Sequence, residues 1–516
     1  MARVVVIGAG VGGLCVAVRL AAAGHRVTVC EAADSVGGKL GVLERDGFRF
    51  DTGPSLLTWP EVFADTFAAA GVRLDDHLQL ERIDPVFRYR FADGTWLTVP
   101  NGPPGWVAEA LGEQLGGTAA RDWRAFCRHA ETIWRVVRGP FLSEPLHGPL
   151  DLLRHSRRLR DLRTVAPWRT LRGTGARFLR DPRLRILLDR YATYAGSDPR
   201  RAPAALAVVP WLEQAHGVWY IRGGLRGLAE ALADRATAAG AQIRLGARVA
   251  AVRAERDRVG GVQLDSGEHL HADVVVCNAD ASRLYGELLD APAARVPLRR
   301  LRRATPSLSG FVLLLGVRGR TPGRVHHTVL FPADYDAEFN SIFGTARRDG
   351  VFGTAPRGSH LGTGRQWPRP VPDPTIYLAV PDDPAVGPDD QHEAWFVLVN
   401  APLQDPQRGM DWDCAELTER YAERVLHVLA QRGVDVQDRI VYRGIRTPAD
   451  LQRDTGAPGG AIYGTSSNGL AAAFLRPANR SPLPGLFLVG GSAHPGGGLP
   501  LVAQSAAIVA RLVGPA

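Results

Sequence analysis

The sequence predicts an α/β protein built around a strand–helix–strand unit whose texture returns in two later blocks of the chain. The chain opens with a strand, a glycine-rich turn, a helix and a second strand. A helix and strands of similar texture return near the middle, and a strand, a glycine loop and a helix close the chain. The residues between these blocks have a different texture of mixed helices and strands, and we interpret them as two excursions from the first unit.

The opening block runs from Val4 to Glu31. Apolar runs predict buried strands at Val4–Ile7 and Val27–Cys30, and the segment between them predicts a helix at about Gly12–Ala23. A secretory signal or a membrane span also begins with an apolar run, but Arg19 interrupts this one and its glycines disfavour a signal helix. The block therefore predicts a strand–helix–strand unit.

Three glycines in the opening turn have the GxGxxG spacing of dinucleotide-binding proteins. Gly8 permits a tight turn, Gly10 lets a pyrophosphate approach the backbone, and Gly13 lets the helix lie close to the strand. The phosphates would meet free N–H groups at the positive end of the helix. Glu31 ends the second strand, where an acidic residue accepts the ribose hydroxyls. The block predicts a Rossmann-like dinucleotide site.

Composition excludes several classes of protein. The 516 residues suggest about three domain-sized units, with the 45% hydrophobic and 22% charged residues of a globular protein. Five scattered cysteines argue against a disulfide framework or a zinc site, so we expect no metal. The net charge is +9, and nearly all the positively charged residues are arginines. The sequence nevertheless contains no nucleic-acid-binding module. Attraction to anionic lipid remains open for such a basic chain.

A basic, amphipathic segment lies within a region, about Val107–Arg190, that is predicted to be mostly helical. From Arg154 to Arg172, arginines alternate with leucines, and Trp168 lies among them. This pattern is typical of a helix that lies on a membrane surface. The alternative is a solvated helix packed on the protein's own core.

Further turns precede and follow this region. Gly37 and Gly38 form a flexible turn, Lys39 is a potential phosphate partner, and residues 51–55 form a second tight turn. At the C-terminal end, Leu486–Val489 is a buried strand that leads into a glycine-rich loop and a helix. The loop is either a backbone that a flat ligand approaches closely or a plain connection; we favour the ligand.

With these blocks placed, the chain resembles the bacterial phytoene desaturases, a family of carotenoid dehydrogenases. The similarity extends over nearly the whole length, and its most specific part is GLFLVGGSAHPGGGLP at residues 485–500. Other matching segments are GAGVGGL at 8–14, GGKL at 37–40, FDTGPS at 50–55, YAGSDPRRAPA at 194–204, GVWYIRGGLRGL at 217–228, NADA at 278–281, HHTVLF at 326–331, DPTIY at 373–377, DTGAPGGAIYG at 454–464 and FLRPAN at 474–479. The chain departs from the family mainly in a lengthened loop from about Gly350 to Pro372.

The resemblance implies FAD, held by an interleaved fold related to the amine oxidases and the escort proteins of prenylated partners. It implies an FAD-binding domain formed by residues 1–65, 205–295 and 440–516, and an α+β substrate and membrane-docking domain formed by residues 66–204 and 296–439. By position, the cofactor-binding residues are expected to be Gly8, Gly10, Gly13, Glu31, Gly38, Lys39, Pro54, Ser55, Val249, Gly490, Gly491, Pro500, Leu501 and Val502. Val249 is expected to end a strand and to pack near the adenine.

The implied activity is desaturation of a long polyene, phytoene or a derived acyclic carotenoid, with hydride transfer to flavin N5. A quinone or oxygen would be the terminal electron acceptor. His494, Glu213 and His216 are the candidates for a polar catalytic group. The alternatives are that His494 only caps the glycine loop and that Glu213 and His216 lie on a surface turn.

A polyene is drawn from the bilayer, so the resemblance also implies a cytoplasmic protein that docks peripherally on the inner face of the cell membrane. Three other functions compete with this interpretation. They are a hydroxycarotenoid 3,4-desaturase or a carotenoid ketolase or oxygenase on the same scaffold, a flavin-free escort protein, and an NAD-dependent dehydrogenase. The last does not explain the C-terminal glycine loop.

Overall fold

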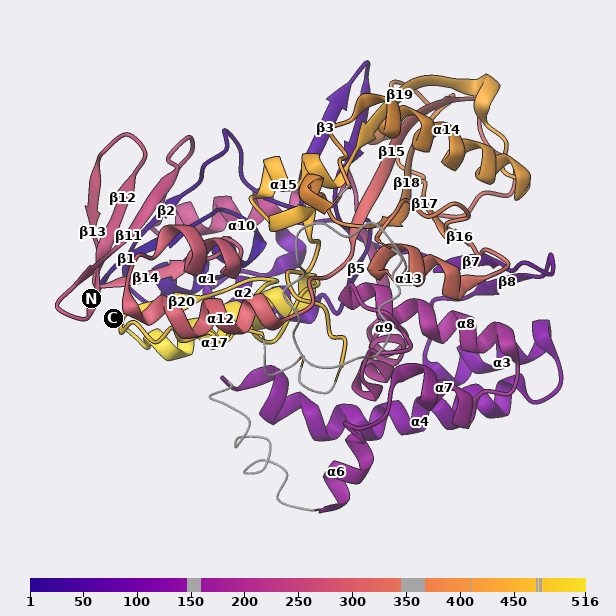
Figure 1. Cartoon of the computed structure of the whole chain (residues 1–516), viewed down its shortest axis with the longest axis horizontal. Coiled ribbons are helices and arrows are strands. Elements are labelled where there is room, and N and C mark those ends of the chain that lie inside the picture. Colours follow the sequence, from indigo (N-terminus) through magenta and orange to yellow (C-terminus); the bar gives the residue numbers. More distant parts are fainter. Residues whose placement is uncertain (146–158, 345–366, 409, 470–471, 473–475) are drawn as a thin grey trace, which may run out of the picture.

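The computed structural model describes residues 1–145, 159–344, 367–408, 410–469, 472 and 476–516. A parallel sheet with its helices forms one half of the molecule, and a larger mixed sheet with a helical region forms the other (Figure 1). Both halves contain segments that are far apart in the sequence. The predicted loop at about 350–372 and the start of the basic segment, residues 154–158, fall largely or wholly outside the described residues.

The first sheet has five parallel strands and unites the three predicted blocks. Strand β1 is central, paired on one side with β2 and on the other with β14, and the C-terminal strand β20 adds to β14. The near-continuous apolar runs of these strands are buried, as expected for a parallel sheet covered on both faces. In spatial order the strands are β10 (Gln242–Arg244), β2 (Arg26–Cys30), β1 (Arg3–Ile7), β14 (Val274–Cys277) and β20 (Leu486–Leu488).

Helix α1 (Val11–Ala22) packs between two helices from distant parts of the chain, α10 (Arg226–Ala238) and α17 (Leu499–Val513). The contact of α1 with its own strand needs a glycine. A Cβ atom on Gly13 would lie 2.0 Å from the carbonyl oxygen of Gly8, and Gly8 itself has a φ of +96°. The glycine spacing is therefore a steric requirement of this strand–helix turn.

Three small antiparallel sheets flank these elements. Val249 begins strand β11, whereas the sequence analysis expects it to end a strand. The three-stranded meander of β11, β12 and β13 starts at this residue. The small sheets comprise β11 (Val249–Glu255), β12 (Arg258–Leu264) and β13 (His269–His271); β3 (Val42–Arg45) and β4 (Phe48–Asp51); and β5 (Leu57–Thr58), β9 (Val218–Ile221) and β6 (Leu80–Arg82).

The second large sheet has seven strands and forms the wall of the other half. Its pairing is antiparallel except between β16 and β7. Strand β19 belongs to this sheet through its pairing with β15, although the predicted domain limits assign residues from 440 onward to the cofactor domain. The spatial order is β19 (Ile440–Arg446), β15 (Ser309–Arg318), β18 (His392–Ala401), β17 (Ile376–Ala379), β16 (His327–Leu330), β7 (Phe87–Arg90) and β8 (Trp96–Val99).

A helical region lies next to the second sheet, at the lower right of Figure 1. Its elements are α3 (Pro104–Leu115), α4 (Ala119–Val137), η2 (Arg138–Ser143), α6 (Leu159–Val165), α7 (Leu171–Phe178), α8 (Pro182–Arg190), η3 (Tyr191–Ala195), η4 (Ala204–Ala207) and α9 (Val208–His216). Other helices, besides several single-turn 3₁₀ helices, are α2 (Glu61–Ala69), α11 (Ala281–Arg283), η5 (Leu284–Leu288), α12 (Arg295–Arg303), α13 (Tyr335–Phe343), α14 (Ala415–Gln431) and α15 (Pro448–Thr455).

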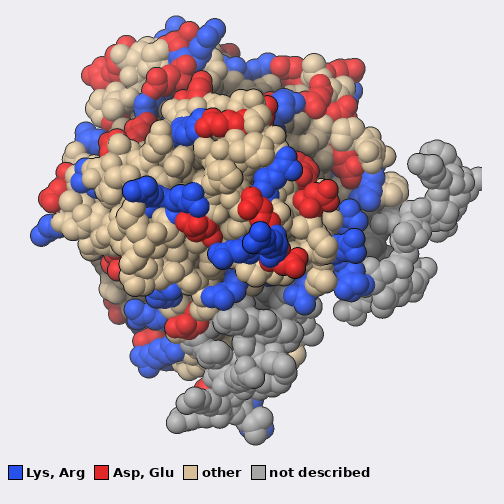
Figure 2. Space-filling view, turned by 90° about the vertical axis from the view of Figure 1, so that its left-hand side faces the viewer, with Lys and Arg blue, Asp and Glu red and all other residues tan. Residues whose placement is uncertain are grey.

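The basic segment is not uniformly available to a membrane. Arg172 at its end forms ion pairs of 2.7 Å with Asp189 and with Asp336, so this arginine is engaged by carboxylates of the protein itself. Arg163, Trp168 and Arg169 are exposed, with Trp168 57% accessible. None of the described helices is both long and apolar enough to span a bilayer. On the face shown in Figure 2, basic and acidic side chains are interspersed.

Candidate functional site

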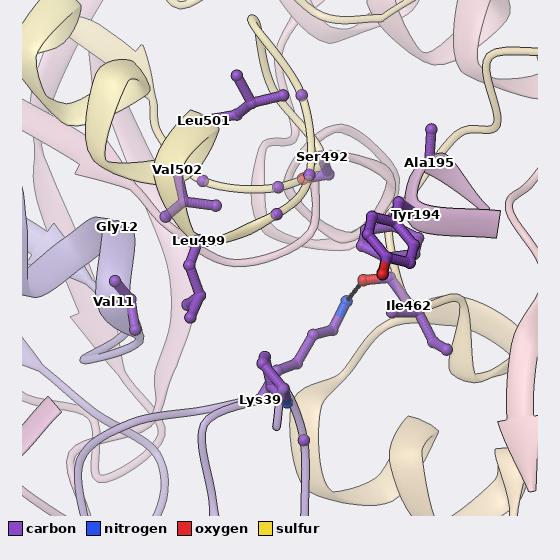
Figure 3. Close-up of a pocket in the computed structure, with 18 of the residues that line it drawn as sticks. Val11, Gly12, Lys39, Tyr194, Ala195, Ile462, Ser492, Leu499, Leu501 and Val502 are labelled. Atoms are coloured by element: carbon purple, nitrogen blue, oxygen red, sulfur yellow. Dashed lines mark hydrogen bonds between the residues drawn. The ribbon is translucent and has the colours of Figure 1, made fainter. Parts of the chain in front are cut away.

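A cavity of about 930 Å³ lies between the two halves of the molecule. Its walls include Gly8 and Glu31 from the N-terminal block, Val249 from the middle block, and Gly491 and Val502 from the C-terminal block. Figure 3 shows Val11 and Gly12 of α1 on one side of this space and Leu499, Leu501 and Val502 of α17 on another. Both ends of the chain therefore border one cavity.

Contacts at Gly12 bring those ends together. A Cβ atom on Gly12 would lie 3.1 Å from Gly490 Cα and 3.1 Å from Val502 Cγ1. The same atom would lie 2.6 Å from the side-chain oxygen of Asn278, and a Cβ on Gly490 would lie 2.7 Å from that oxygen. Asn278 follows strand β14 and fills the gap between the two glycine turns. From the sequence, Asn278 belongs to the matching segment NADA at 278–281 but is not among the predicted site residues; its position directly after a buried strand was the available signal.

Glu31 holds the first glycine turn. Its carboxylate accepts hydrogen bonds from the backbone N–H groups of Ala9 at 2.6 Å and Ala33 at 2.9 Å. Helix α1 begins after Gly10 without a side-chain cap, so the first N–H groups of the helix receive no side-chain hydrogen bond at the cap. The positive end of α1 is thus open to an anion in the cavity.

The C-terminal glycine loop is held by a partly buried arginine, Arg476. Arg476 donates to the carbonyl oxygens of Gly491 and Thr465, and burial lowers the pKa of Arg476 to about 10. A Cβ on Gly497 would lie 2.5 Å from the Tyr463 ring, so only glycine fits there. Helix α17 starts after Gly498, again without a side-chain cap. Pro500, Leu501 and Val502 in its first turn line the cavity, as does Gly490.

Lys39 connects the N-terminal block to a segment near the C-terminus. Its Nζ donates to the carbonyl oxygens of Ala461 at 2.9 Å and Ile462 at 2.6 Å, as Figure 3 illustrates for Ile462. Burial lowers the pKa of Lys39. The preceding Gly38 and the turn residues Pro54 and Ser55 also line the cavity. The ammonium group thus has backbone partners as well as a place in the cavity wall.

These features fit a dinucleotide that carries a flat ring. Two uncapped helix N-termini, those of α1 and α17, begin at the cavity wall. Glycines line the wall where the backbone turns approach the cavity. Gly10 is one of them, and a Cβ atom there would lie 2.7 Å from the Asn278 amide. Among the residues that the structure describes, no cluster of His, Cys, Asp or Glu could hold a metal ion.

The three candidate catalytic residues have different environments. Glu213 lies on α9 with only 4% of its surface exposed and lines the cavity. His494 also lines the cavity, donates from Nε2 to the Glu144 carbonyl oxygen at 3.1 Å, and has its pKa lowered to about 4 by burial. His216 contacts Glu61 at 3.3 Å and is not among the cavity residues. A surface turn is therefore the wrong location for Glu213 and His216, which both lie in a helix.

The Glu213 carboxylate is poised to change its protonation near neutral pH. Burial raises its pKa from 4.5 to about 7, while a hydrogen bond from the Tyr191 hydroxyl at 2.6 Å opposes the shift. The Tyr194 hydroxyl donates to its other oxygen at 3.4 Å. A buried carboxylate with such a pKa has the properties of a general base.

Comparisons with known proteins agree with this geometry. Residues 11–361 match the sequence model of a family described as flavin containing amine oxidoreductase. A 4,4'-diapolycopene oxygenase of Methylomonas sp is 33% identical over 98% of this chain and 97% of its own. A hydroxyneurosporene desaturase of Rubrivivax gelatinosus is 34% identical over 99% and 92%. A zeta-carotene-forming phytoene desaturase of Myxococcus xanthus is 33% identical over 98% and 93%.

Solved structures support the fold alone. Putrescine oxidase bound to putrescine matches with a TM-score of 0.62 and 15% identity over 99% of this chain and 98% of its own. Cyclohexylamine oxidase from Brevibacterium oxydans matches with a TM-score of 0.57 and 16% identity over 99% of both chains. The amine oxidase-like α/β architecture predicted from the sequence is therefore confirmed.

The raised pKa of Glu213 predicts that the free energy of unfolding depends on pH. Its folded-state pKa, about 7, exceeds the 4.5 of the unfolded chain, so its contribution is complete below the lower value and disappears as the pH rises through the upper one. We expect the difference in unfolding free energy between wild type and Glu213→Gln to fall by about 2–3 kcal/mol between about pH 5 and about pH 8. Urea unfolding at each pH measures this difference. Glu113→Gln, which changes an exposed carboxylate, is the control. If the difference between wild type and Glu213→Gln were as independent of pH as that for Glu113→Gln, the prediction would be contradicted.

Proposed function

Since the chain belongs to the carotenoid desaturases and oxygenases of the flavin-containing amine oxidoreductase family, we propose that this flavin-dependent oxidoreductase is an FAD-dependent carotenoid desaturase. Its substrate would be phytoene or a derived acyclic carotenoid. The observation that carries the proposal is one cavity that joins a glycine-lined cradle to an apolar compartment, in which Glu213 is the buried carboxylate among the described lining residues.

The choice of FAD rests on the cradle. Gly8, Gly10 and the N-terminus of α1 would bind the pyrophosphate, with Gly13 keeping the helix close, and Glu31 the adenosine ribose. The remaining residues expected to border the cofactor are Gly38, Lys39, Pro54, Ser55, Val249, Gly490, Gly491, Pro500, Leu501 and Val502. When bound, the flavin accepts a hydride, and a quinone or oxygen would reoxidise it.

The apolar compartment suits a polyene chain. Helices α4 and α9 and the segments beside them contribute aliphatic and aromatic side chains to the cavity. These are Val136, Val137, Phe141, Leu142, Leu206, Val209 and Leu212. Burial of such surfaces against a hydrocarbon stabilises the complex without directional bonds. The same walls exclude water, which strengthens electrostatic interactions within the compartment.

We assign to Glu213 the role of proton acceptor. Removing two hydrogens from adjacent CH₂ groups releases a hydride equivalent and a proton, and the proton needs a base inside the apolar cavity. Of the three candidates, Glu213 is a cavity residue with an acceptor available and a pKa near neutrality. The His494 Nε2 already donates to a backbone carbonyl, and His216 contacts Glu61 outside the cavity.

We expect Glu213→Gln to lower the rate of substrate-dependent flavin bleaching, measured anaerobically by stopped-flow absorbance, by about 10²-fold or more. In the wild type the rate rises with pH through about 7, because the base acts when deprotonated. This dependence disappears in the variant. Undiminished bleaching in a variant that retains its flavin would remove Glu213 from the mechanism, and Glu113→Gln provides the matched control.

Membrane docking would supply the substrate. Asp161, Val165 and Pro167 line the cavity, and the exposed Arg163, Trp168 and Arg169 lie beside them in the chain. An exposed tryptophan among arginines favours the interface of an anionic bilayer. We therefore propose a cytoplasmic protein bound peripherally to the inner face of the cell membrane. The exposed residues Arg163, Trp168 and Arg169, which we call the rim, would make the contact.

The combined variant Arg163→Glu, Trp168→Ser and Arg169→Glu is expected to lower binding to anionic phospholipid vesicles at least about tenfold in co-sedimentation. Arg121→Glu with Trp106→Ser, which changes two exposed side chains on α4 and α3, is the control. If both variants co-sedimented like the wild type, the rim would not be the docking surface.

An oxygenase reaction is the second candidate, because the diapolycopene oxygenase is as similar to this chain as the desaturases are. Product analysis by mass separates the two: desaturation removes two hydrogens per step, whereas oxygenation adds oxygen. A flavin-free escort protein has no use for the intact glycine cradle and the uncapped helix N-termini, so we disfavour it.

A further inference from the structure

Arg190 is a buried cation in the wall of the cavity. It lies at the end of α8, is 5% exposed and is one of the cavity residues. Within the described part of the chain it forms no ion pair. Its hydrogen bonds run from Nη1 to the hydroxyl oxygens of Tyr194 at 3.0 Å and Tyr89 at 3.4 Å. A guanidinium group that is removed from water without a carboxylate partner is expensive to maintain.

Aromatic rings offset part of this cost. The Arg190 guanidinium carbon lies 4.6 Å from the ring centroid of Phe87, 5.1 Å from that of Tyr194 and 5.5 Å from that of Tyr377. These contacts hold the charge at the cavity wall. An apolar side chain of similar size at such a position commonly leaves a fold as stable or makes it more stable. The stability of the fold therefore does not account for the cation.

The two carboxylate oxygens of Glu213 have different surroundings. Oε1 accepts the 2.6 Å hydrogen bond from Tyr191, which is not among the described residues that line the cavity. Oε2 accepts from the hydroxyl of Tyr194 at 3.4 Å, and Tyr194 lines the cavity (Figure 3). A distance of 3.4 Å is long for such a bond, so Oε2 keeps most of its capacity to accept. The carboxylate is thus anchored through Oε1 and available through Oε2.

Tyr194 connects the cation to this carboxylate. Its hydroxyl oxygen accepts from Arg190, and its hydroxyl hydrogen is directed to Glu213 Oε2. A hydroxyl has only one hydrogen, so accepting from the guanidinium favours donation to the carboxylate. Hydrogen bonds joined in this way polarise one another in a low-dielectric interior. A positive charge one hydroxyl away favours the ionised form of a carboxyl group.

The other titratable groups that face Glu213 or its helix α9 do not supply this charge. Burial raises the pKa of the phenols and the thiol among them, so these groups are neutral. They are Tyr89, Tyr191, Tyr194 and Tyr377, and Cys127 of α4, which contacts Gln214. On α3, Glu109 and Glu113 are exposed, and η4 and β5 carry no titratable side chain. Burial raises the pKa of Glu213, and Arg190 is the charged group that opposes this.

Resting on the proposed function, in which Glu213 takes the proton, we propose that Arg190 is a positioning residue for the reaction. Through Tyr194 it keeps the Glu213 carboxylate ionised and holds Oε2 toward the cavity as the atom that receives the proton. The proton moves from a substrate carbon to Oε2, and the electron pair of that C–H bond forms the new double bond. The second hydrogen departs as a hydride to the flavin of the proposed function.

The test is the pH dependence of anaerobic flavin bleaching in the flavin-loaded enzyme. The probe is the acyclic carotenoid, phytoene or one of its desaturation products, that bleaches the wild type fastest. We expect Arg190→Met to move the midpoint of the rate increase upward by about one pH unit or more, because the carboxylate loses its cation. At about pH 6 the rate then falls about tenfold or more, whereas well above the midpoint it stays within about threefold of the wild type. A merely structural role would lower the rate equally at every pH.

Two further variants separate the charge from its connection to Glu213. Tyr194→Phe keeps the cation but removes the linking hydroxyl, and it should move the midpoint upward by a smaller amount. Arg190→Lys keeps a positive charge and should leave the midpoint closer to that of the wild type than Arg190→Met does. Arg180→Met and Tyr285→Phe, which change residues outside the cavity, are the matched controls and should keep the wild-type profile.

A wild-type midpoint in both Arg190→Met and Tyr194→Phe would overturn the inference and leave the desaturase assignment intact. Should Arg190→Met lose its flavin, Tyr194→Phe decides, and a wild-type midpoint in that variant would remove Arg190 from the control of the base. The proposed function would fail differently. In that case none of the carotenoids would bleach the wild type, or Glu213→Gln would be bleached as fast as the wild type.

Discussion

The structure depends on the close approach of two backbone turns that are nearly 500 residues apart. At Gly12 and Gly490 there is no room for a Cβ atom, because Val502 and the Asn278 side chain fill the space around them. Dense packing of this kind tolerates little added volume. It places the N-termini of α1 and α17 at one cavity, so that both helices present unbonded N–H groups to whatever occupies it.

The remaining architecture follows from that junction. The parallel sheet anchors both turns, the seven-stranded sheet closes the opposite side, and helices α4 and α9 add apolar walls. Into this compartment the chain introduces a small polar group made of Arg190, Tyr194 and Glu213. Its charges are expensive to bury, which is the physical reason for connecting them with substrate chemistry and not with stability.

Much of the fold was readable from the sequence, because long apolar runs and glycine spacing report on local structure. The strands at Val4–Ile7 and Leu486–Val489 and the helix after Gly10 were predicted within one or two residues. Contacts between segments that are distant in the chain could not be predicted from the sequence. The bonding of Lys39 to Ala461 and Ile462, the ion pairs of Arg172, the start of a strand at Val249 and the burial of Glu213 all depend on tertiary packing that no local pattern encodes.

A crystal structure of the flavin-loaded protein would test the central claim most directly. We expect one dinucleotide per chain, with its pyrophosphate at the N-terminus of α1 and its flavin ring between the turn at Pro54 and the start of α17. A flavin bound outside the cavity that Gly8 and Gly491 share, or contacting only one end of the chain, would contradict it.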